Sequence, residues 1–267
     1  MKSFEEIDVK TCRSVAGIVF DIDDTVTRDG IVEADAYQAM HDLKHAGFKL
    51  IAVTGRPIGW VEVLTRFWPL DAAVGENGAG WLWRHGGTIY EAYFADESTR
   101  RGHRVVLDRI RSRVAREMPH IRETNDRRAR RCDLAFDIGE HVRVDASDIA
   151  ALVALIEQEG AHSSVSSVHA HAAPGPWDKA QGTIRAARAA FGIDLRHDRD
   201  GWMFVGDSGN DAAAFDFFPL SVGVRNVAEY LDRLLTPPAY ITTADRGRGF
   251  SQLVRHVLSA RHGPPTR

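Results

Sequence analysis

Acidic side chains occur where two short apolar segments of the sequence end. Asp21 and Asp23 close the segment that begins at residue 17, and Asp207 closes the segment that begins at residue 201. Both segments are of the kind that forms buried β-strands, and the carboxyl ends of parallel strands form the ligand crevice of an open sheet. Three carboxylates at one sheet edge would make a hard, oxygen-rich site, which suits Mg²⁺ better than a metal that prefers sulfur. The sequence therefore predicts a magnesium site where these acids converge.

Polar residues also follow two further predicted strands, and we expect them at the same edge of the sheet: Thr54, Gly55, Arg56, Glu76 and Asn77. Two interpretations are open for Glu76 and Asn77. They can cap a helix and form a turn, or they can contact a substrate in the crevice.

Secondary-structure signals place these positions in a β–α–β–α–β arrangement. Apolar residues at helical spacing predict helices over residues 33–46 and 58–68, between strands at 17–21, 48–53 and 72–76. Helices of this length suit the crossovers between parallel strands. This part of the chain is therefore expected to be an α/β layer.

The middle of the chain has a different character. Glycines and aromatic residues over 80–93 predict a hairpin that leaves the parallel layer, and an Arg-rich helix is expected over 98–117. A strand, a helix and a further strand are then predicted over 132–138, 147–160 and 164–172.

The first pattern returns after a break rich in proline and glycine at 174–176. Helices are predicted over 178–192, 210–218, 227–235 and 249–260, strands over 201–207 and 220–224, and a disordered tail over 263–267. We therefore expect an α/β fold with a core formed by residues 1–83 and 174–267, interrupted by an inserted α+β domain at 84–173.

Composition narrows the class of protein. The chain has 267 residues, of which 44% are hydrophobic and 27% charged, so it can bury a sizeable core. A formal charge of −3 gives no chain-wide reason to expect nucleic acid or a membrane as a partner. Two cysteines are too few for a disulfide framework or a four-cysteine zinc site. No apolar run reaches the ~18 residues that span a bilayer, and no signal-peptide core is present at the start, so a cytoplasmic location is expected.

The predicted insertion contains two features whose role is open. His169 and His171 share one face of a predicted strand and point to its junction with the core, where they could pack or contact substrate. Residues 98–131 hold twelve arginines and four acids, which could form a solvated surface, attract an anionic substrate or bind nucleic acid. We expect the loop 122–131 to be the part that reaches the crevice.

Four motifs together resemble those of a known family. They are VFDIDDTVT (19–27), AVTGRP (52–57), Lys179 within WDKAQG, and VGDSGND (205–211). The combination resembles the haloacid dehalogenase-like hydrolase superfamily. The insertion between the second and third motifs is similar to the large α/β caps of the Cof, sucrose-phosphatase and mannosyl-3-phosphoglycerate phosphatase type. The resemblance implies a Rossmann-like doubly wound core with an inserted cap.

The resemblance also implies roles for the acidic residues. Asp21 would attack phosphorus to form an aspartyl-phosphate, and Asp23 would serve as general acid and base. Asp21 and Asp207 would hold Mg²⁺ through their side chains and Asp23 through its backbone carbonyl, with Asp211 in an outer position.

The remaining implied roles concern the phosphoryl group and the substrate. Thr54 and Gly55 would bind phosphoryl oxygens, and Lys179 would offset the negative charge of the nucleophile and the phosphate. Candidate substrate contacts are Arg56, Glu76, Asn77, His169, His171 and Asn210.

The sequence thus indicates a Mg²⁺-dependent phosphatase that acts on a small phosphorylated metabolite, such as a sugar phosphate. A phosphomutase of the same superfamily and a nucleic-acid-binding protein that uses the Arg-rich segment are the alternatives. We expect no nucleic acid or membrane as partner, and a monomer or homodimer.

Overall fold

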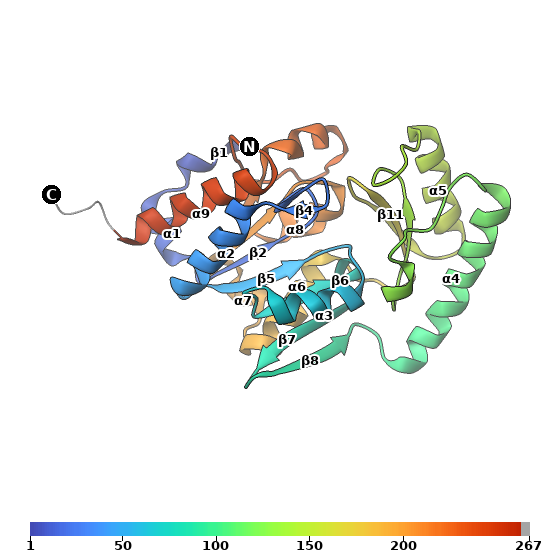
Figure 1. Ribbon diagram of the computed structural model, residues 1–267, viewed down its shortest axis with the longest axis horizontal. Helices are drawn as coiled ribbons and strands as arrows, with labels where there is room; N and C mark the ends of the chain where they lie inside the picture. Colours follow the sequence, from blue (N-terminus) through green and yellow to red (C-terminus); the bar gives the residue numbers. More distant parts are fainter. Residues whose placement is uncertain (263–267) are drawn as a thin grey trace.

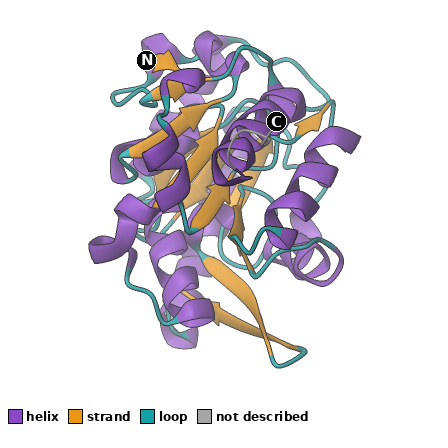
Figure 2. Ribbon diagram, turned by 90° about the vertical axis from the view of Figure 1, so that its left-hand side faces the viewer, coloured by secondary structure: helices purple, strands orange, loops and turns teal. Residues whose placement is uncertain are grey.

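The structure of the protein is a computed structural model that describes residues 1–262. The predicted tail at 263–267 lies outside the described residues. A large sheet with helices on both faces forms the core, and a smaller sheet with two helices forms the insertion beside it (Figure 1 and Figure 2). The predicted α/β class, with a largely parallel core sheet and an α+β insertion, is confirmed.

The core sheet has nine strands within the described residues, in the order β1-β14-β13-β12-β2-β5-β6-β7-β8. Neighbours from β1 to β6 run parallel, and β7 and β8 are antiparallel additions at one edge. The central strands are buried on both faces, which explains their nearly continuous apolar sequences. The strands are β1 (Lys2–Ser3), β2 (Gly17–Phe20), β5 (Lys49–Val53), β6 (Ala72–Gly75), β7 (Gly80–His85), β8 (Thr88–Tyr93), β12 (Trp202–Gly206), β13 (Leu220–Gly223) and β14 (Tyr240–Ile241).

The hairpin predicted over 80–93 is present but does not leave the core layer. β7 pairs with β6 along the sheet, and β8 pairs with β7. Trp81 and Leu82 are buried, so the apolar residues of the hairpin extend the core instead of the insertion. The prediction that residues 84–93 belong to the insertion is therefore wrong.

Helices cover both faces of the core sheet. Those on one face are α1, α2, α3 and α9, and those on the other are α6, α7 and α8. The predicted helix ending before Gly47 is confirmed, and Gly47 has φ +83°, a conformation that glycine adopts without a steric cost. The bounds are α1 (Val9–Ser14), α2 (Ala34–His45), α3 (Ile58–Phe67), α6 (Lys179–Phe191), α7 (Leu195–Asp198), α8 (Ala212–Phe217) and α9 (Arg246–His262).

The insertion has an apolar core of its own. Its antiparallel sheet has the order β10-β11-β9, and α4 and α5 lie on the side away from the core sheet (Figure 1). Leu107 and Ile110 of α4 are buried in the same apolar cluster as Leu152 of α5 and Phe136 of β9. The elements are α4 (Glu97–Glu117), β9 (Leu134–Asp137), α5 (Ala146–Gln158), β10 (His162–Val165) and β11 (His169–Ala173).

The single strand predicted over 164–172 is in fact a hairpin of β10 and β11. Ser166 makes the turn possible, because its hydroxyl accepts hydrogen bonds from the backbone N–H of Val168 and His169 at 3.3 and 3.0 Å. A serine hydroxyl can replace a backbone partner in a turn without interrupting the alternation that predicts a strand. The sequence pattern therefore concealed the turn.

The helix predicted over 227–235 is also wrong, because two short 3₁₀ helices occupy this stretch. Two prolines follow it closely and prevent the turns from continuing as an α-helix. Short elements that the sequence did not predict are β3 (Thr27–Arg28), β4 (Ile31–Val32), η1 (Phe4–Glu6), η2 (Glu76–Gly78), η3 (Arg127–Ala129), η4 (Arg199–Gly201), η5 (Gly209–Asp211), η6 (Arg225–Glu229) and η7 (Leu231–Arg233).

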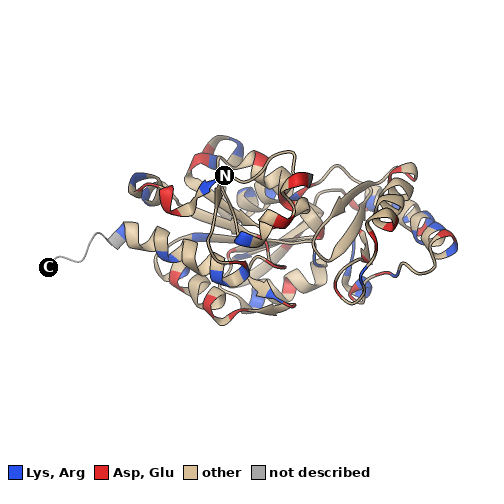
Figure 3. Ribbon diagram, turned by 90° about the horizontal axis from the view of Figure 1, so that it is seen from above, with Lys and Arg blue, Asp and Glu red and all other residues tan. Residues whose placement is uncertain are grey.

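The arginines of α4 are mixed with acidic residues on an outer face of the insertion (Figure 3). Arg101 pairs with Glu97, and Arg109 and Arg113 both pair with Glu159. This pairing favours the solvated-surface interpretation of the Arg-rich segment. In the described part of the chain, no helix combines the length and the apolar character needed to cross a membrane.

Candidate active site

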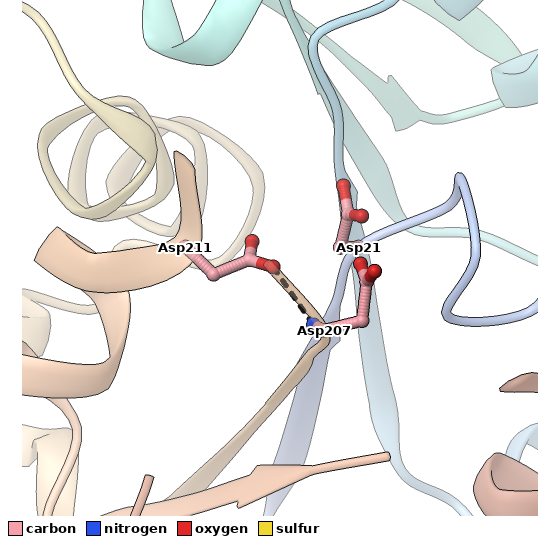
Figure 4. Close-up of side chains that lie close together, drawn as sticks. All are labelled: Asp21, Asp207 and Asp211. Atoms are coloured by element: carbon pink, nitrogen blue, oxygen red, sulfur yellow. Dashed lines mark hydrogen bonds between the residues drawn. The ribbon is translucent and has the colours of Figure 1, made fainter. Parts of the chain in front are cut away.

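Three buried carboxylates meet at the carboxyl ends of two central strands. Asp21 follows β2, Asp207 follows the neighbouring parallel strand β12, and Asp211 lies in the turn before α8. One carboxylate oxygen of each lies within 4.8 Å of the others, and all three residues are buried (Figure 4). The parallel pairing of β2 and β12 therefore brings together acids that are 186 residues apart in sequence. These three residues are called the acidic cluster below.

One cation lies inside the acidic cluster. The ammonium group of Lys179, at the start of α6, donates hydrogen bonds at 2.6 Å to both Asp21 and Asp211. Burial opposes the charge of Lys179, but these two carboxylates raise its pKa above the usual value. Burial raises the pKa of Asp21 to about 7, although Lys179 acts in the opposite direction.

The donor atoms of the cluster fit a hard divalent cation. Among the residues that the structure describes, the side chain of Asp207 has two neutral donors as partners, the hydroxyl of Thr25 at 3.1 Å and the amide of Asn226 at 3.2 Å. Burial, together with the nearby Asp21 and Asp211, raises the pKa of Asp207 well above its ordinary value. One lysine cannot balance three carboxylates, so a site of buried oxygen ligands with excess negative charge suits Mg²⁺.

Asp211 differs from Asp21 and Asp207 because one of its oxygens accepts hydrogen bonds from two backbone N–H groups. One oxygen of Asp211 accepts from Lys179, and the other accepts from the backbone N–H of Asp207 and Ser208 at 2.9 and 3.1 Å. Figure 4 shows the hydrogen bond from Asp207. Asp211 therefore braces the loop after β12 as well as lining the cluster. This arrangement agrees with an outer position for Asp211.

The loop after β5 lies beside the acidic cluster. Thr54 is fully buried, and its hydroxyl accepts a hydrogen bond from the backbone N–H of Arg56 at 3.0 Å. Gly55 lines the same small cavity as Asp21 and Asp23. A Cβ at Gly55 would lie only 2.9 Å from Nε2 of His171, so the close approach of the insertion requires glycine at this position.

Asp23 lies outside the acidic cluster and is held by Arg56. Nη2 and Nε of Arg56 donate to one oxygen of Asp23 at 2.6 and 2.9 Å. The same guanidinium also donates to Glu140 of the insertion at 2.9 Å. Arg56 therefore connects the second acid of the DxD pair directly to the insertion.

Glu76 was expected either to cap a helix and form a turn or to contact a substrate, and its contacts in the structure are with the backbone. Its carboxylate accepts hydrogen bonds from the backbone N–H of Ile58, at the start of α3, and of Arg131, Cys132 and Asp133 in the insertion. Glu76 is fully buried, so its side chain attaches the insertion to the core instead of facing a ligand. This is the helix-capping and turn interpretation, extended to a second segment of the chain.

The amide side chains predicted near the substrate form a bridge across the crevice. Asn210 donates to Asn77 at 3.1 Å and accepts from Ser208 at the same distance. The amide of Asn77 donates to Ser164 of the insertion at 3.4 Å. The structure thus brings both predicted asparagines to one place.

The two histidines of β11 also reach this place. His169 and His171 are 2% and 1% exposed, and each has a carboxylate partner within the insertion. Nε2 of His169 lies 2.8 Å from Glu140, and Nδ1 of His171 lies 2.9 Å from Asp133. Both rings therefore have fixed orientations at the junction of the insertion with the core.

Arg56, a predicted substrate contact, instead forms ion pairs with Asp126 and Glu140 of the insertion, which the sequence did not single out. Nη1 of Arg130 donates to the backbone carbonyl of Gly55 at 3.0 Å, which confirms that the loop 122–131 reaches the crevice. The same side chain pairs with Asp126 at 2.9 Å and Asp133 at 3.0 Å. We call the following set the junction: Arg56, Asp126, Arg130, Asp133 and Glu140.

The signal for the junction residues was weak but present. Asp133 stands just before β9, which pairs with β11. Pairing of these two predicted strands would have placed a carboxylate beside His171. Glu140 had no such signal, because it lies in the irregular loop after β9.

The cavity between the acidic cluster and the insertion is small. Its volume is about 10 Å³, which is roughly the space of one water molecule. A wider basin of about 510 Å³ adjoins it at Asp23 and is lined by charged side chains of both signs from both parts, including Arg56, Arg246 and Glu140. A ligand larger than water therefore requires the insertion and the core to rearrange. The small cavity is lined by Asp21, Asp23, Gly55, Ser166, Ser167, His169, His171, Ser208 and Asn210.

Comparison with known proteins extends over both parts of the chain. Residues 18–111 match the family model of the haloacid dehalogenase-like hydrolases. Protein 0175 of Thermoplasma acidophilum is similar over 91% of this chain and 98% of its own, with a TM-score of 0.70 at 20% identity. A HAD/COF-like hydrolase from Plasmodium vivax is similar over 94% and 99%, with a TM-score of 0.66 at 16% identity.

A sucrose-phosphatase from Synechocystis, solved in complex with sucrose and phosphate, is similar over 91% of this chain and 98% of its own, with a TM-score of 0.64 at 16% identity. No curated protein matches the chain at a significant level. At these identities the structural similarity shows a shared fold, which includes the insertion.

Proposed function

We propose that the chain belongs to the haloacid dehalogenase-like hydrolases, whose family model matches residues 18–111, and that it is a Mg²⁺-dependent phosphatase acting on a small phosphorylated metabolite. The observation that carries the proposal is the position of Lys179 between Asp21 and Asp211, 2.6 Å from each, inside a buried acidic cluster. A carboxylate nucleophile that must approach a phosphate dianion needs such a fixed cation beside it.

In the proposed cycle, an oxygen of Asp21 attacks phosphorus. A new oxygen–phosphorus bond forms, the ester bond breaks, and Asp23 gives its proton to the leaving alkoxide. Asp23 then takes a proton from water, which attacks the aspartyl-phosphate and releases inorganic phosphate and free Asp21. The contact with Arg56 holds Asp23 in one orientation for both transfers.

Fixed donors of the chain bind the phosphoryl group in this scheme. The hydroxyl of Thr54 and the backbone N–H of Gly55 lie on the loop after β5. Lys179, at the start of α6, supplies positive charge. Asp21 and Asp207 would hold Mg²⁺ through their side chains and Asp23 through its backbone carbonyl, with Asp211 in an outer position. The ion would neutralise charge between the nucleophile and the phosphate.

The proposed substrate class rests on the way the insertion covers the acidic cluster. The insertion closes the acidic cluster to a cavity of about 10 Å³ with a largely polar lining, so the leaving group must be accommodated between insertion and core. Hydroxyl and amide side chains in that lining favour a hydroxylated leaving group such as a sugar. The fold neighbour that was solved with sucrose and phosphate supports the same substrate class.

A screen of phosphorylated metabolites in Mg²⁺ buffer tests the proposal. We expect release of inorganic phosphate from at least one sugar or polyol phosphate without a bisphosphate activator, and no release by the Asp21→Asn variant. A requirement for the activator with retention of phosphate would identify a phosphomutase. Absence of turnover for every ester, together with salt-sensitive binding of RNA or DNA, would contradict the proposal.

A further inference from the structure

One buried polar atom at the small cavity has no partner. Among the described residues, Nε2 of His171 forms no hydrogen bond, although the side chain is only 1% exposed. Unsatisfied buried polar groups are uncommon and point to water, an ion or a ligand. The same cavity is lined by Asp21, which is the proposed nucleophile.

The partners of His171 determine whether Nε2 donates or accepts a hydrogen bond. Nδ1 lies 2.9 Å from Asp133, and Arg130 donates to both oxygens of Asp133 at 3.0 and 3.1 Å. Burial raises the pKa of Asp133, but Arg130 donates to both of its oxygens and favours the carboxylate form. A carboxylate accepts a hydrogen bond, so we place the ring proton on Nδ1 and a lone pair on Nε2. Burial lowers the pKa of His171 well below its ordinary value, and Arg130 acts in the same direction, so the ring stays neutral.

A neutral ring with a free lone pair needs a proton donor as partner. A phosphoryl dianion has no proton to give, so the phosphate itself is a poor partner for Nε2. The edge of the ring nevertheless lies directly over Gly55, close enough that a Cβ there would be 2.9 Å from Nε2. Nε2 therefore lies next to the phosphoryl loop but suits a different part of the substrate.

We propose that Nε2 of His171 accepts a hydrogen bond from a hydroxyl on the carbon next to the phosphate ester, and so selects polyol and sugar phosphates over alkyl phosphates. This inference rests on the proposed phosphatase function. His171 is the specificity-determining residue, and Asp133 is a positioning residue that fixes the tautomer of the ring. A substrate without this hydroxyl leaves the buried lone pair unsatisfied and binds less well.

Matched substrate pairs test this inference. The pairs are glycerol 3-phosphate with 3-hydroxypropyl phosphate, and glucose 1-phosphate with 2-deoxyglucose 1-phosphate, while p-nitrophenyl phosphate reports basal activity. The native chain is expected to prefer the hydroxylated member of at least one pair by about tenfold in kcat/KM. His171→Leu should reduce that preference to about twofold or less, mainly by lowering kcat/KM for the hydroxylated member of the pair.

Two further variants make the test specific. His171→Gln retains a carbonyl acceptor and should recover part of the preference. His162→Leu makes the same change at an exposed position on the neighbouring strand β10 and should leave the preference unchanged. A native enzyme that hydrolyses these esters without a threefold preference in either pair, or a preference that survives His171→Leu, would overturn the inference. Failure to hydrolyse any ester would instead count against the proposed phosphatase function.

The tautomer of the His171 ring can be measured in the native chain, so this test does not depend on whether a variant folds. The ring nitrogens of His171 are assigned by nitrogen NMR of the histidines. We expect a proton on Nδ1 and none on Nε2. A proton on Nε2 would overturn the inference, because the atom could then donate to phosphate and could not accept from a hydroxyl.

Discussion

Two groups of buried charge lie next to each other in this molecule, and they differ in how the charge is compensated. In the junction, every carboxylate contacts a guanidinium, through Arg56 or Arg130. In the acidic cluster, Lys179 contacts Asp21 and Asp211, but Asp207 has the neutral partners Thr25 and Asn226. Each carboxylate of the junction is therefore paired with a cation of the chain, whereas Asp207, among the described residues, is not, which fits the proposed metal site.

This difference in charge compensation suggests a structural role for the junction and a catalytic role for the acidic cluster. The junction pairs three carboxylates with two guanidinium groups of the chain, so loss of one of these cations leaves buried charge unpaired and destabilises the fold. A buried group with excess negative charge is a place for a metal ion and a polyanionic substrate. Changes in the acidic cluster should thus alter catalysis with small effects on folding, whereas removal of Arg130 from the junction should act mainly on stability.

The largest expected effect comes from the proposed nucleophile. Asp21→Asn keeps the shape of the side chain but removes its nucleophilic charge, so kcat should fall by at least about a thousandfold. The melting temperature should not fall, because a carboxylate whose charge burial disfavours has been replaced by a neutral group. The matched control is Asp29→Asn in the exposed turn between β3 and β4, which should retain kcat within about threefold.

Removal of the metal should have the next largest effect. Dialysis against EDTA should reduce activity at least about a hundredfold, and Mg²⁺ should restore it. Ca²⁺ should inhibit, because its 6–8 ligands at ~2.3–2.6 Å can engage the second oxygen of Asp21. Mg²⁺ should also raise the melting temperature, since it relieves repulsion in the acidic cluster. Full activity after dialysis would refute the assignment of the cluster as a metal site.

A change in the junction should act mainly on stability. Arg130→Met leaves Asp126 and Asp133 buried without their cation, which should lower the free energy of unfolding by about 3–5 kcal/mol. Arg127→Met, at an exposed position three residues earlier, should change it by less than about 0.5 kcal/mol. Urea unfolding measures both values. Equal losses for the two variants would show that the ion pairs of Arg130 do not hold the insertion.

The smallest expected effect is dependent on pH. Hydrogen bonds from His169 and Arg56 lower the pKa of Glu140 to about 2 in the folded chain, from 4.5 for an unperturbed glutamate. This carboxylate therefore stabilises the fold above pH 4.5, and the contribution is lost as the pH falls towards 2. Glu140→Gln should cost about 1–2 kcal/mol at pH 7 and almost nothing near pH 2.

Unfolding measured across this pH range separates Glu140 from an ordinary surface acid. Glu97→Gln, whose partner is the exposed Arg101, should change the unfolding free energy by less than about 0.5 kcal/mol at pH 7. A cost for Glu140→Gln that is the same at every pH would contradict its role as a charged partner of Arg56.

The core and its acids could be predicted because their signals are local. A buried parallel strand is a continuous apolar run, and the acids of the cluster stand at or just beyond the ends of such runs. The parallel pairing then places Asp21 and Asp207 together without further information.

The junction could not be predicted to the same extent because its contacts are made between distant segments. Arg130 meets Gly55, and Glu140 meets Arg56, only after the insertion has packed on the core. The role of Glu76 was also hidden, since its partners are backbone N–H groups, which every residue except proline has.

The covalent step at Asp21 is the central claim, and trapping the phosphorylated chain tests it most directly. The enzyme is mixed with a slight excess of p-nitrophenyl phosphate and Mg²⁺, quenched in acid at millisecond intervals, digested and analysed by peptide mass spectrometry. We predict one phosphoryl group on the peptide that contains Asp21, formed as fast as nitrophenol is released and absent from Asp21→Asn. Release of nitrophenol at the full rate with no phosphopeptide at any time, and with a tenth or more of normal turnover in Asp21→Asn, would contradict the account.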